Sequence, residues 1–233
     1  MNCSKLSSTV PALLLAVGIV VAGFALKAGI DNIAYRDREV SVRGLAEREV
    51  KADNASWYVS FTITGDDLQT LYAQLEQKSA TVKSFVKENG IDEGDITIGT
   101  PSVYEPQAER YGDTNRNYRY ALTGTVNVNT GKVDAVYAMV GKQGVLLSRG
   151  VPFSETYVNY NFNGLNSIKP EMIADATKNA REAAAQFAKD SESTLGKIKT
   201  ASQGQFSIEN FDSGKPYMKN VRVVSTVVYY LED

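Results

Sequence analysis

One uninterrupted apolar run, Val10 to Leu26, constrains this chain more than any other feature of its sequence. A helix of about 17 residues would extend about 26 Å, near the lower limit for crossing a bilayer. We therefore expect residues 1–30 to form an N-terminal tail and a transmembrane anchor, with Pro11 in the first helical turn. A cleaved signal sequence is the alternative, although the best small-x-small triplet, Gly23-Phe24-Ala25, lies inside the run.

The anchor has an expected orientation and an expected lipid-facing set. Positive residues are more frequent after the run than before it, which argues against a cytoplasmic N-terminus, but large domains are exported largely regardless of charge. We expect the main domain to lie outside the cytoplasm. The side chains expected to contact lipid are Val10, Leu14, Val17, Ile19, Val21, Phe24 and Leu26.

Composition narrows the possible chemistry. The sequence contains no histidine and one cysteine, Cys3, which precedes the apolar run. This excludes the commonest general base, Ser-His-Asp catalysis and histidine metal sites, and it leaves the main domain without a disulfide. The formal net charge is −2, and no dense Lys/Arg cluster predicts nucleic-acid binding. We expect no metal, no cofactor, no nucleic-acid partner and no enzymatic activity.

A strand–helix–strand–strand pattern occurs twice, over about residues 57–129 and 156–231. Corresponding elements begin at 57 and 156, 67 and 168, 96 and 197, and 118 and 221, which are offsets of 99 to 103 positions. Each copy would place one helix against one face of an antiparallel sheet. The expected fold is therefore an α+β domain over residues 38–232, a two-layer antiparallel sheet with helices on one face.

The expected boundaries follow from periodicity and from turn residues. In the first copy they are a strand 57–64, a helix capped by Asp66 or Asp67 and stopped at Asn89-Gly90, a strand 96–104, a loop 105–117 and a strand 118–129. In the second they are a strand 156–163, a helix with Pro170 in its first turn and Gly196 as its stop, a strand 197–208, a loop 209–219 and a strand 221–231. A strand 39–50 and a short helix 131–141 lie outside the repeat.

The two helices carry apolar stripes at helical spacing. The first stripe contains Leu68, Leu71, Tyr72, Leu75, Ser79, Val82, Phe85 and Val86, and the second contains Ile173, Ala176, Ala180, Ala184, Phe187, Ala188 and Leu195. The alanines of the second helix suit a close approach to a sheet or to another helix, or they reflect helix propensity alone.

The last strand is apolar on both faces, whereas a sheet with helices on one side should have a polar outer face. Val224, Val228 and Tyr230 lie on the second face. Either a subunit contact or the extra N-terminal strand region would cover them. These three residues are the candidate interface.

The loops 105–117 and 209–219 would face the same end if the repeat holds. Their candidate rim residues are Glu105, Tyr111, Phe211 and Tyr217. Such a rim would suit a small molecule, peptide or glycan, because tyrosine combines an aromatic body with a polar tip. Two solvated hairpin loops are the simpler interpretation.

The segment Val40 to Asp53 resembles the opening strand of the SIMPL-domain family of bacterial envelope proteins, also labelled oxidative-stress defence proteins. That strand leads into a V-x-P-D-x-A turn, which Asp53 and Ala55 match while Ala52 replaces the proline. Lys169-Pro170, the alanine-rich helix and Leu195 to Ile198 are similar to the family's helix-to-strand passage. The resemblance covers about residues 38–232.

The resemblance implies export to the periplasm, assembly of some members into ring-like or channel-like homo-oligomers, and a link to stress tolerance. It implies no catalytic residues. We therefore expect a single-pass protein of the inner membrane with its main domain in the periplasm, which self-assembles into a large homo-oligomer with a scaffolding or stress-protective role. The alternative is an envelope binding module. A third possibility is a hydrolase of the glycosidase kind, which needs a pair of carboxylates. The only residues that suggest it are the loop residues Glu105, Glu109 and Asp113.

Overall fold

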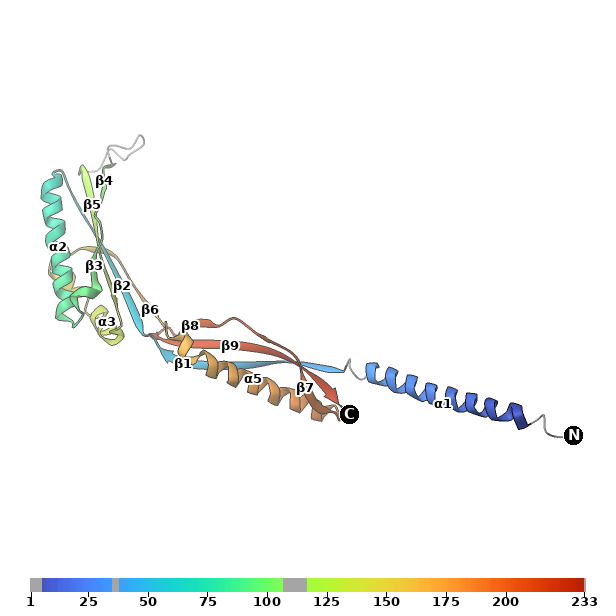
Figure 1. Cartoon of the computed structure of the whole chain (residues 1–233). Helices are drawn as coiled ribbons and strands as arrows, with labels where there is room; N and C mark the ends of the chain where they lie inside the picture. The colour runs from blue at the N-terminus through green and yellow to red at the C-terminus, as the bar shows by residue number, and fades with distance from the viewer. Residues whose placement is uncertain (1–5, 35–37, 107–116, 233) are drawn as a thin grey trace. The chain divides into compact units, whose positions relative to one another are not determined.

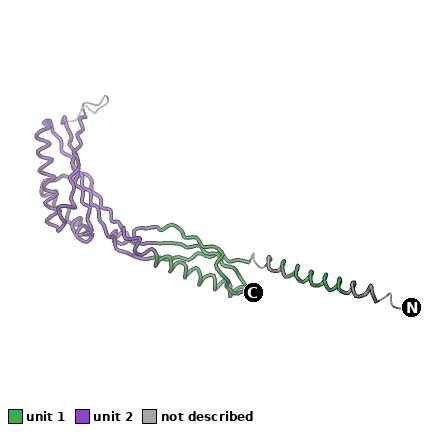
Figure 2. Tube along the Cα trace, in the orientation of Figure 1, with its two compact units in different colours: residues 1–47, 170–206, 222–233 green, residues 48–169, 207–221 purple. Residues whose placement is uncertain are grey.

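The computed structural model describes residues 6–34, 38–106 and 117–232. The chain divides into two compact units (Figure 2). Unit 1 comprises residues 1–47, 170–206 and 222–233, and unit 2 comprises residues 48–169 and 207–221. Each unit contains an antiparallel sheet and helical segments (Figure 1), so the α+β class is confirmed.

The apolar run forms helix α1, Leu6–Ala34. Its described large apolar side chains are 53–70% exposed; they are Leu14, Leu15, Val17, Ile19, Val20, Val21, Phe24 and Leu26. The side chain of Val10 lies outside the described residues. Within the described residues, no helix is both long enough and apolar enough to cross a membrane. The predicted transmembrane helix is therefore not confirmed.

Unit 2 is built on a sheet with the strand order β3-β5-β2-β6, in which β4 also pairs with β5. The strands are β2 (Asn54–Gly65), β3 (Ile96–Ile98), β4 (Ser102–Tyr104), β5 (Tyr120–Thr130) and β6 (Phe153–Asn161). The helices are α2 (Leu68–Glu88), α3 (Val133–Val140) and α4 (Gly144–Ser148), with a 3-10 turn at Glu93–Asp95. The predicted strand 96–104 is interrupted, and β3 and β4 pair separately with β5.

The alternation in β2 produces the core of unit 2. Trp57, Val59 and Phe61 are at most 1% exposed and pack in one cluster with the buried face of α2. On the opposite face Tyr58 stacks on Tyr157 of β6, with ring centroids 4.7 Å apart. The prediction of a half-buried strand is confirmed, because successive side chains of a strand point to opposite faces.

Helix α2 begins and ends where local chemistry predicts. Asp67 is the N-cap, and its carboxylate accepts a hydrogen bond from the backbone N–H of Thr70 at 2.9 Å. Asn89 is the C-cap, and Gly90 follows with φ of +89°, a conformation that favours glycine. The predicted apolar stripe of this helix included two residues that are not buried, because Leu68 is 41% exposed and Tyr72 is 48% exposed.

The sheet of unit 1 has the order β1-β9-β7, and β8 also pairs with β9. The strands are β1 (Glu39–Lys51), β7 (Thr194–Gln203), β8 (Ser207–Asp212) and β9 (Lys215–Glu232). The residues of β8 and the first part of β9 belong to unit 2. Helix α5, Leu165–Asp190, packs on one face of the unit 1 sheet, where Ala180 and Ala184 form a cluster with Val42, Val227 and Tyr229.

The alanines of α5 permit a very close approach to β1. A Cβ added at Gly44 would lie 1.8 Å from the backbone oxygen of Ala176 and 2.5 Å from the backbone nitrogen of Ala180. Only a residue without a side chain fits there. The interpretation that the alanine stripe packs closely on a sheet is therefore correct for Ala176 and Ala180.

Three predictions for the second copy were wrong. Helix α5 begins at Leu165 and contains Pro170, and it ends at Asp190, so Leu195 and Gly196 lie in β7. Phe187 is 60% exposed rather than part of the stripe, and Met172 is buried in its place. The predicted loop 209–219 is instead a hairpin of β8 and β9.

The two copies also do not form two closed units. Strand β6, the first strand of the second copy, pairs with β2 of the first copy over Asn54–Phe61. In unit 1, β9 pairs instead with β1 and β7. The order of elements repeats along the chain, but the strand pairing does not.

Candidate functional site

The predicted interface residues lie on the face of the unit 1 sheet opposite α5. Val223, Val227 and Tyr229 are at most 3% exposed, whereas the alternate residues Val224, Val228 and Tyr230 are partly buried. Strand β1 lies beside β9 in the same sheet, and the Leu231 N–H donates a 2.9 Å hydrogen bond to the carbonyl oxygen of Arg38, directly before β1. The extra N-terminal strand therefore does not cover the second face, and this explanation is wrong.

The predicted rim residues are not brought together. Glu105 forms a 2.8 Å ion pair with Arg119. The backbone N–H of Arg119 donates a 2.9 Å hydrogen bond to the carboxylate of Asp66, which lies just beyond the C-terminal end of β2. Tyr217 accepts a 2.8 Å backbone hydrogen bond from Ala52, just before the N-terminal end of β2. These contacts lie at opposite ends of one strand.

The remaining two rim residues also give no joint site. Phe211 is in β8 and is 48% exposed. Tyr111, Glu109 and Asp113 lie outside the described residues. Glu105 raises the pKa of Arg119 through their hydrogen bond, so this carboxylate is held in an ion pair with an arginine.

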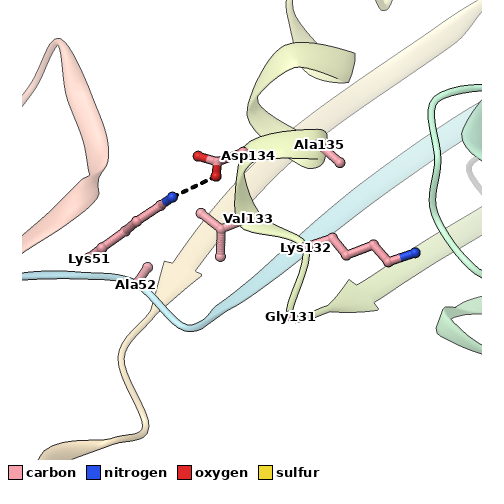
Figure 3. Close-up of a pocket in the computed structure, with 7 residues that line it drawn as sticks. All are labelled: Lys51, Ala52, Gly131, Lys132, Val133, Asp134 and Ala135. Carbon is pink, nitrogen blue, oxygen red and sulfur yellow. Dashed lines mark hydrogen bonds and ion pairs between the residues drawn. The ribbon is translucent and has the colours of Figure 1, made fainter.

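A polar pocket of about 410 Å³ lies where the chain leaves β1 and where α3 begins. In Figure 3 the Lys51 side chain points toward Asp134, and the two form a 2.6 Å ion pair. The Lys132 side chain extends away from this pair; it binds Asp92 at 2.8 Å and the carbonyl oxygen of Gly90 at 2.9 Å. Both lysines therefore already have partners within unit 2, and the geometry is that of a structural contact.

The turn that carries the family resemblance has a clear physical role. The carboxylate of Asp53 accepts hydrogen bonds from the backbone N–H groups of Asn163, at 2.9 Å, and Gly164, at 2.7 Å. The Asp53 N–H donates to the carbonyl oxygen of Asn161 at 3.0 Å. Asp53 therefore joins the β1–β2 turn to the segment that precedes α5, which explains why an aspartate suits this position.

Lys219 is a buried cation that sequence reasoning missed. It is 8% exposed, its ammonium group donates to the side chain of Asn210 in β8, and burial lowers its pKa. A signal was present, since Lys219 occupies the same face of β9 as the buried Val221 and Val223. Within the described residues, no group of three His, Cys, Asp or Glu side chains is placed to hold a metal ion.

Glu93 provides a test of the electrostatics of unit 2. Lys83 and Lys87 contact its two carboxylate oxygens at 2.6 Å and 2.8 Å. The hydrogen bond from Lys83, then that from Lys87, lowers the pKa of Glu93 to about 2. Because the folded-state pKa lies below the ordinary glutamate value of 4.5, the stabilisation is present above about pH 4.5 and is lost as pH falls toward 2.

An NMR titration of the Glu93 carboxyl carbon in the full chain should therefore have its midpoint near 2. The variant with Lys83→Met and Lys87→Met should move this midpoint upward, because both cationic partners are removed. An unaltered chain in which Glu93 titrates near 4.5 would show that the two ion pairs do not persist in solution.

Comparisons with known proteins support a family but not an activity. No curated protein matches the chain. A solved structure with some likeness, a mutant chlorite dismutase from Candidatus Nitrospira defluvii, shares 10% identity; the match covers 79% of this chain and 93% of that one, with a TM-score of 0.24. The family model named SIMPL, protein of unknown function (DUF541), matches residues 40–227. The chain therefore belongs to the SIMPL family.

Proposed function

We propose that this SIMPL-family chain is a non-catalytic protein of the bacterial cell envelope. It is exported, helix α1 holds it at the inner membrane, and its main domain in the periplasm self-associates to form a scaffolding or stress-protective assembly. The observation that carries the proposal is the exposure, by 53–70%, of the large apolar side chains of α1. Exposed apolar surface on this scale is typical of contact with a membrane or a protein partner.

A lipid environment suits α1 because its apolar side chains are not confined to one stripe. Leu14, Leu15 and Val20 point in three directions that are roughly 100–140° apart around the helix axis, and all three are exposed. A helix that is apolar on all sides is typical of complete burial, in a protein core or in lipid. Attachment to a membrane would also concentrate copies in two dimensions and favour their association.

The face formed by Val224, Val228 and Tyr230 suits self-association. These side chains alternate with core residues of β9, and α5 packs on the opposite face. A second copy would remove the two valines from water and would leave the tyrosine hydroxyl at the edge of the contact. Aromatic residues of this kind are enriched in protein interfaces.

Two variants of the full chain separate the two parts of the proposal. Val17→Asp with Val21→Asp places charges in α1, where each would cost about 3 kcal/mol in a bilayer. It should remove the chain from alkali-washed membranes. Val224→Lys with Val228→Lys should leave the membrane fraction unchanged and reduce the mass of the detergent-solubilised particle measured by light scattering.

Phe187→Gln is the matched control, because it removes a 60% exposed apolar side chain from α5 without touching α1 or β9. It should change neither measurement. The proposal fails if the unaltered chain is monomeric in both detergent and lipid vesicles, or if the aspartate variant remains in the washed membranes.

A further inference from the structure

A second pocket in unit 2, distinct from the polar one, has a volume of about 500 Å³. It lies between α3, β6 and the β8–β9 hairpin, and its lining residues are Tyr137, Ala138, Val140, Gly141, Val158, Tyr160 and Pro216. The volume is typical of sites that bind a small molecule, which are commonly about 300–1,000 Å³. It is too small for a folded partner.

Three tyrosine rings are packed together at this pocket. The ring of Tyr217 meets that of Tyr137 at a centroid distance of 4.9 Å and an angle of 68°. It meets the ring of Tyr160 at 6.4 Å and 75°. The backbone of Tyr217 is held by the hydrogen bond from Ala52. Tyr217 is therefore a positioning residue that supports the two tyrosines lining the pocket.

The lining determines the charge of a suitable occupant. It contains no Asp, Glu, Lys or Arg side chain. A charged ligand would lose hydration without gaining an ionic partner, so the lining favours a neutral molecule. The valines, alanine and proline provide apolar contact, and the tyrosines provide faces and edges against which an aromatic ring can pack.

Tyr160 provides the polar group that would orient such a molecule. It is 7% exposed and is one of the residues that line the pocket. A phenol is protonated at neutral pH at its ordinary pKa of about 10, and burial raises the pKa of Tyr160 further. It can therefore donate a hydrogen bond to an acceptor on the ligand.

We propose that this pocket binds a neutral small molecule that carries one aromatic ring and a hydrogen-bond acceptor. The ring packs against Tyr137 and Tyr160, and the acceptor receives the hydroxyl hydrogen of Tyr160. Binding of this small molecule goes beyond the proposed scaffolding role, and it depends neither on membrane attachment nor on self-association.

Acetophenone is a suitable probe, because it has a single ring and a ketone acceptor. The full chain, with ¹³C-labelled tyrosine and in detergent micelles, should show saturable shifts of the Tyr137 and Tyr160 ring signals, with a dissociation constant of about 1 mM. Tyr160→Phe should weaken binding about 5-fold, since it removes one hydrogen bond. Ala138→Leu, which places a larger side chain in the pocket lining, should weaken it at least about 10-fold.

Ala185→Leu is the control for partition of the probe into detergent, because it makes the same substitution at an exposed position of α5. This variant should bind as the unaltered chain does. Cyclohexyl methyl ketone should bind about 5-fold more weakly than acetophenone, and benzoate and benzyltrimethylammonium should give no saturable shift. The proposal would be overturned if the cyclohexyl ketone bound as tightly as acetophenone, or if either ion bound more tightly than acetophenone. It would also be overturned if acetophenone gave no shifts, or shifts that Ala138→Leu left unchanged.

Discussion

Replacing Gly44 with alanine should destabilise unit 1 severely. The added Cβ would lie 1.8 Å from the carbonyl oxygen of Ala176 and 2.8 Å from the Cβ of Ala180. Backbone atoms in a helix cannot rotate away as a side chain can, so α5 must move off the sheet. We expect the free energy of unfolding to fall by about 3 kcal/mol, at the upper end of overpacking effects. Urea unfolding followed by circular dichroism would measure the loss.

The matched control is Gly94→Ala, since a Cβ at Gly94 would meet no atom within 4 Å. It should change stability by less than about 1 kcal/mol. Adding Ala180→Gly to Gly44→Ala should not restore stability, because it removes only the contact with the Ala180 Cβ and leaves those with the backbone of α5. Full rescue by this second change would show that the close approach is between side chains and not between β1 and the helix backbone.

The elements that could be predicted from the sequence are those whose signals are local. Strand β2 alternates with period two, and Asp67 and Gly90 bound α2 through hydrogen bonds and backbone angles within a few residues. Such signals need no knowledge of the tertiary structure. They predicted correctly the buried face of β2 and most of the buried face of α2.

The ends of α5 are determined by other causes. Its start is set by the distant carboxylate of Asp53, and by Ser167, which donates to the carbonyl oxygen of Gly164 from both its backbone N–H and its hydroxyl. Pro170 lies close enough to this start to be tolerated. At the other end Glu192 adopts φ of +57°, and Ser193 donates to the carbonyl oxygen of Ala188. This helix-ending geometry usually uses glycine, so Gly196 was a misleading stop.

The β8–β9 hairpin was missed although its turn has a recognisable sequence. Ser213-Gly214 connects the two strands, and the Gly214 N–H donates to the Asp212 carboxylate at 3.0 Å. A Ser-Gly dipeptide marks a turn, but the whole segment 209–219 was predicted to be one loop. The error also misplaced Phe211 and Tyr217.

The tyrosine pocket could not be predicted from periodicity. Its residues come from α3, β6 and the β8–β9 hairpin, so they become neighbours only when β6 pairs with β2 and the hairpin reaches Ala52. Alternation assigns a residue to a face of its own strand, but it does not identify the segment that packs against that face. Which tyrosines meet is a property of strand pairing, and the repeat predicted that pairing wrongly.

Trp57→Ala should be the most destabilising single truncation in unit 2. Trp57 is 1% exposed and packs near the ring of Phe85, with centroids 6.3 Å apart. Its indole N–H donates to the Thr156 hydroxyl at 2.8 Å, which joins β2 to β6. Removing the side chain loses the free energy gained by burying the indole ring and also leaves a cavity. We therefore expect the free energy of unfolding to fall by about 3–5 kcal/mol, as measured by urea unfolding followed by circular dichroism.

Trp57→Phe and Thr156→Val separate packing from hydrogen bonding. The phenylalanine variant keeps most of the buried ring and loses the donor, so it should cost about 1–3 kcal/mol. Thr156→Val leaves the indole N–H unpaired and should cost a similar amount. Because both changes break the same bond, the double variant should be less destabilised than the sum of the two by about 1 kcal/mol. Strict additivity would mean that the hydrogen bond between Trp57 and Thr156 adds nothing measurable to the backbone pairing of β2 with β6.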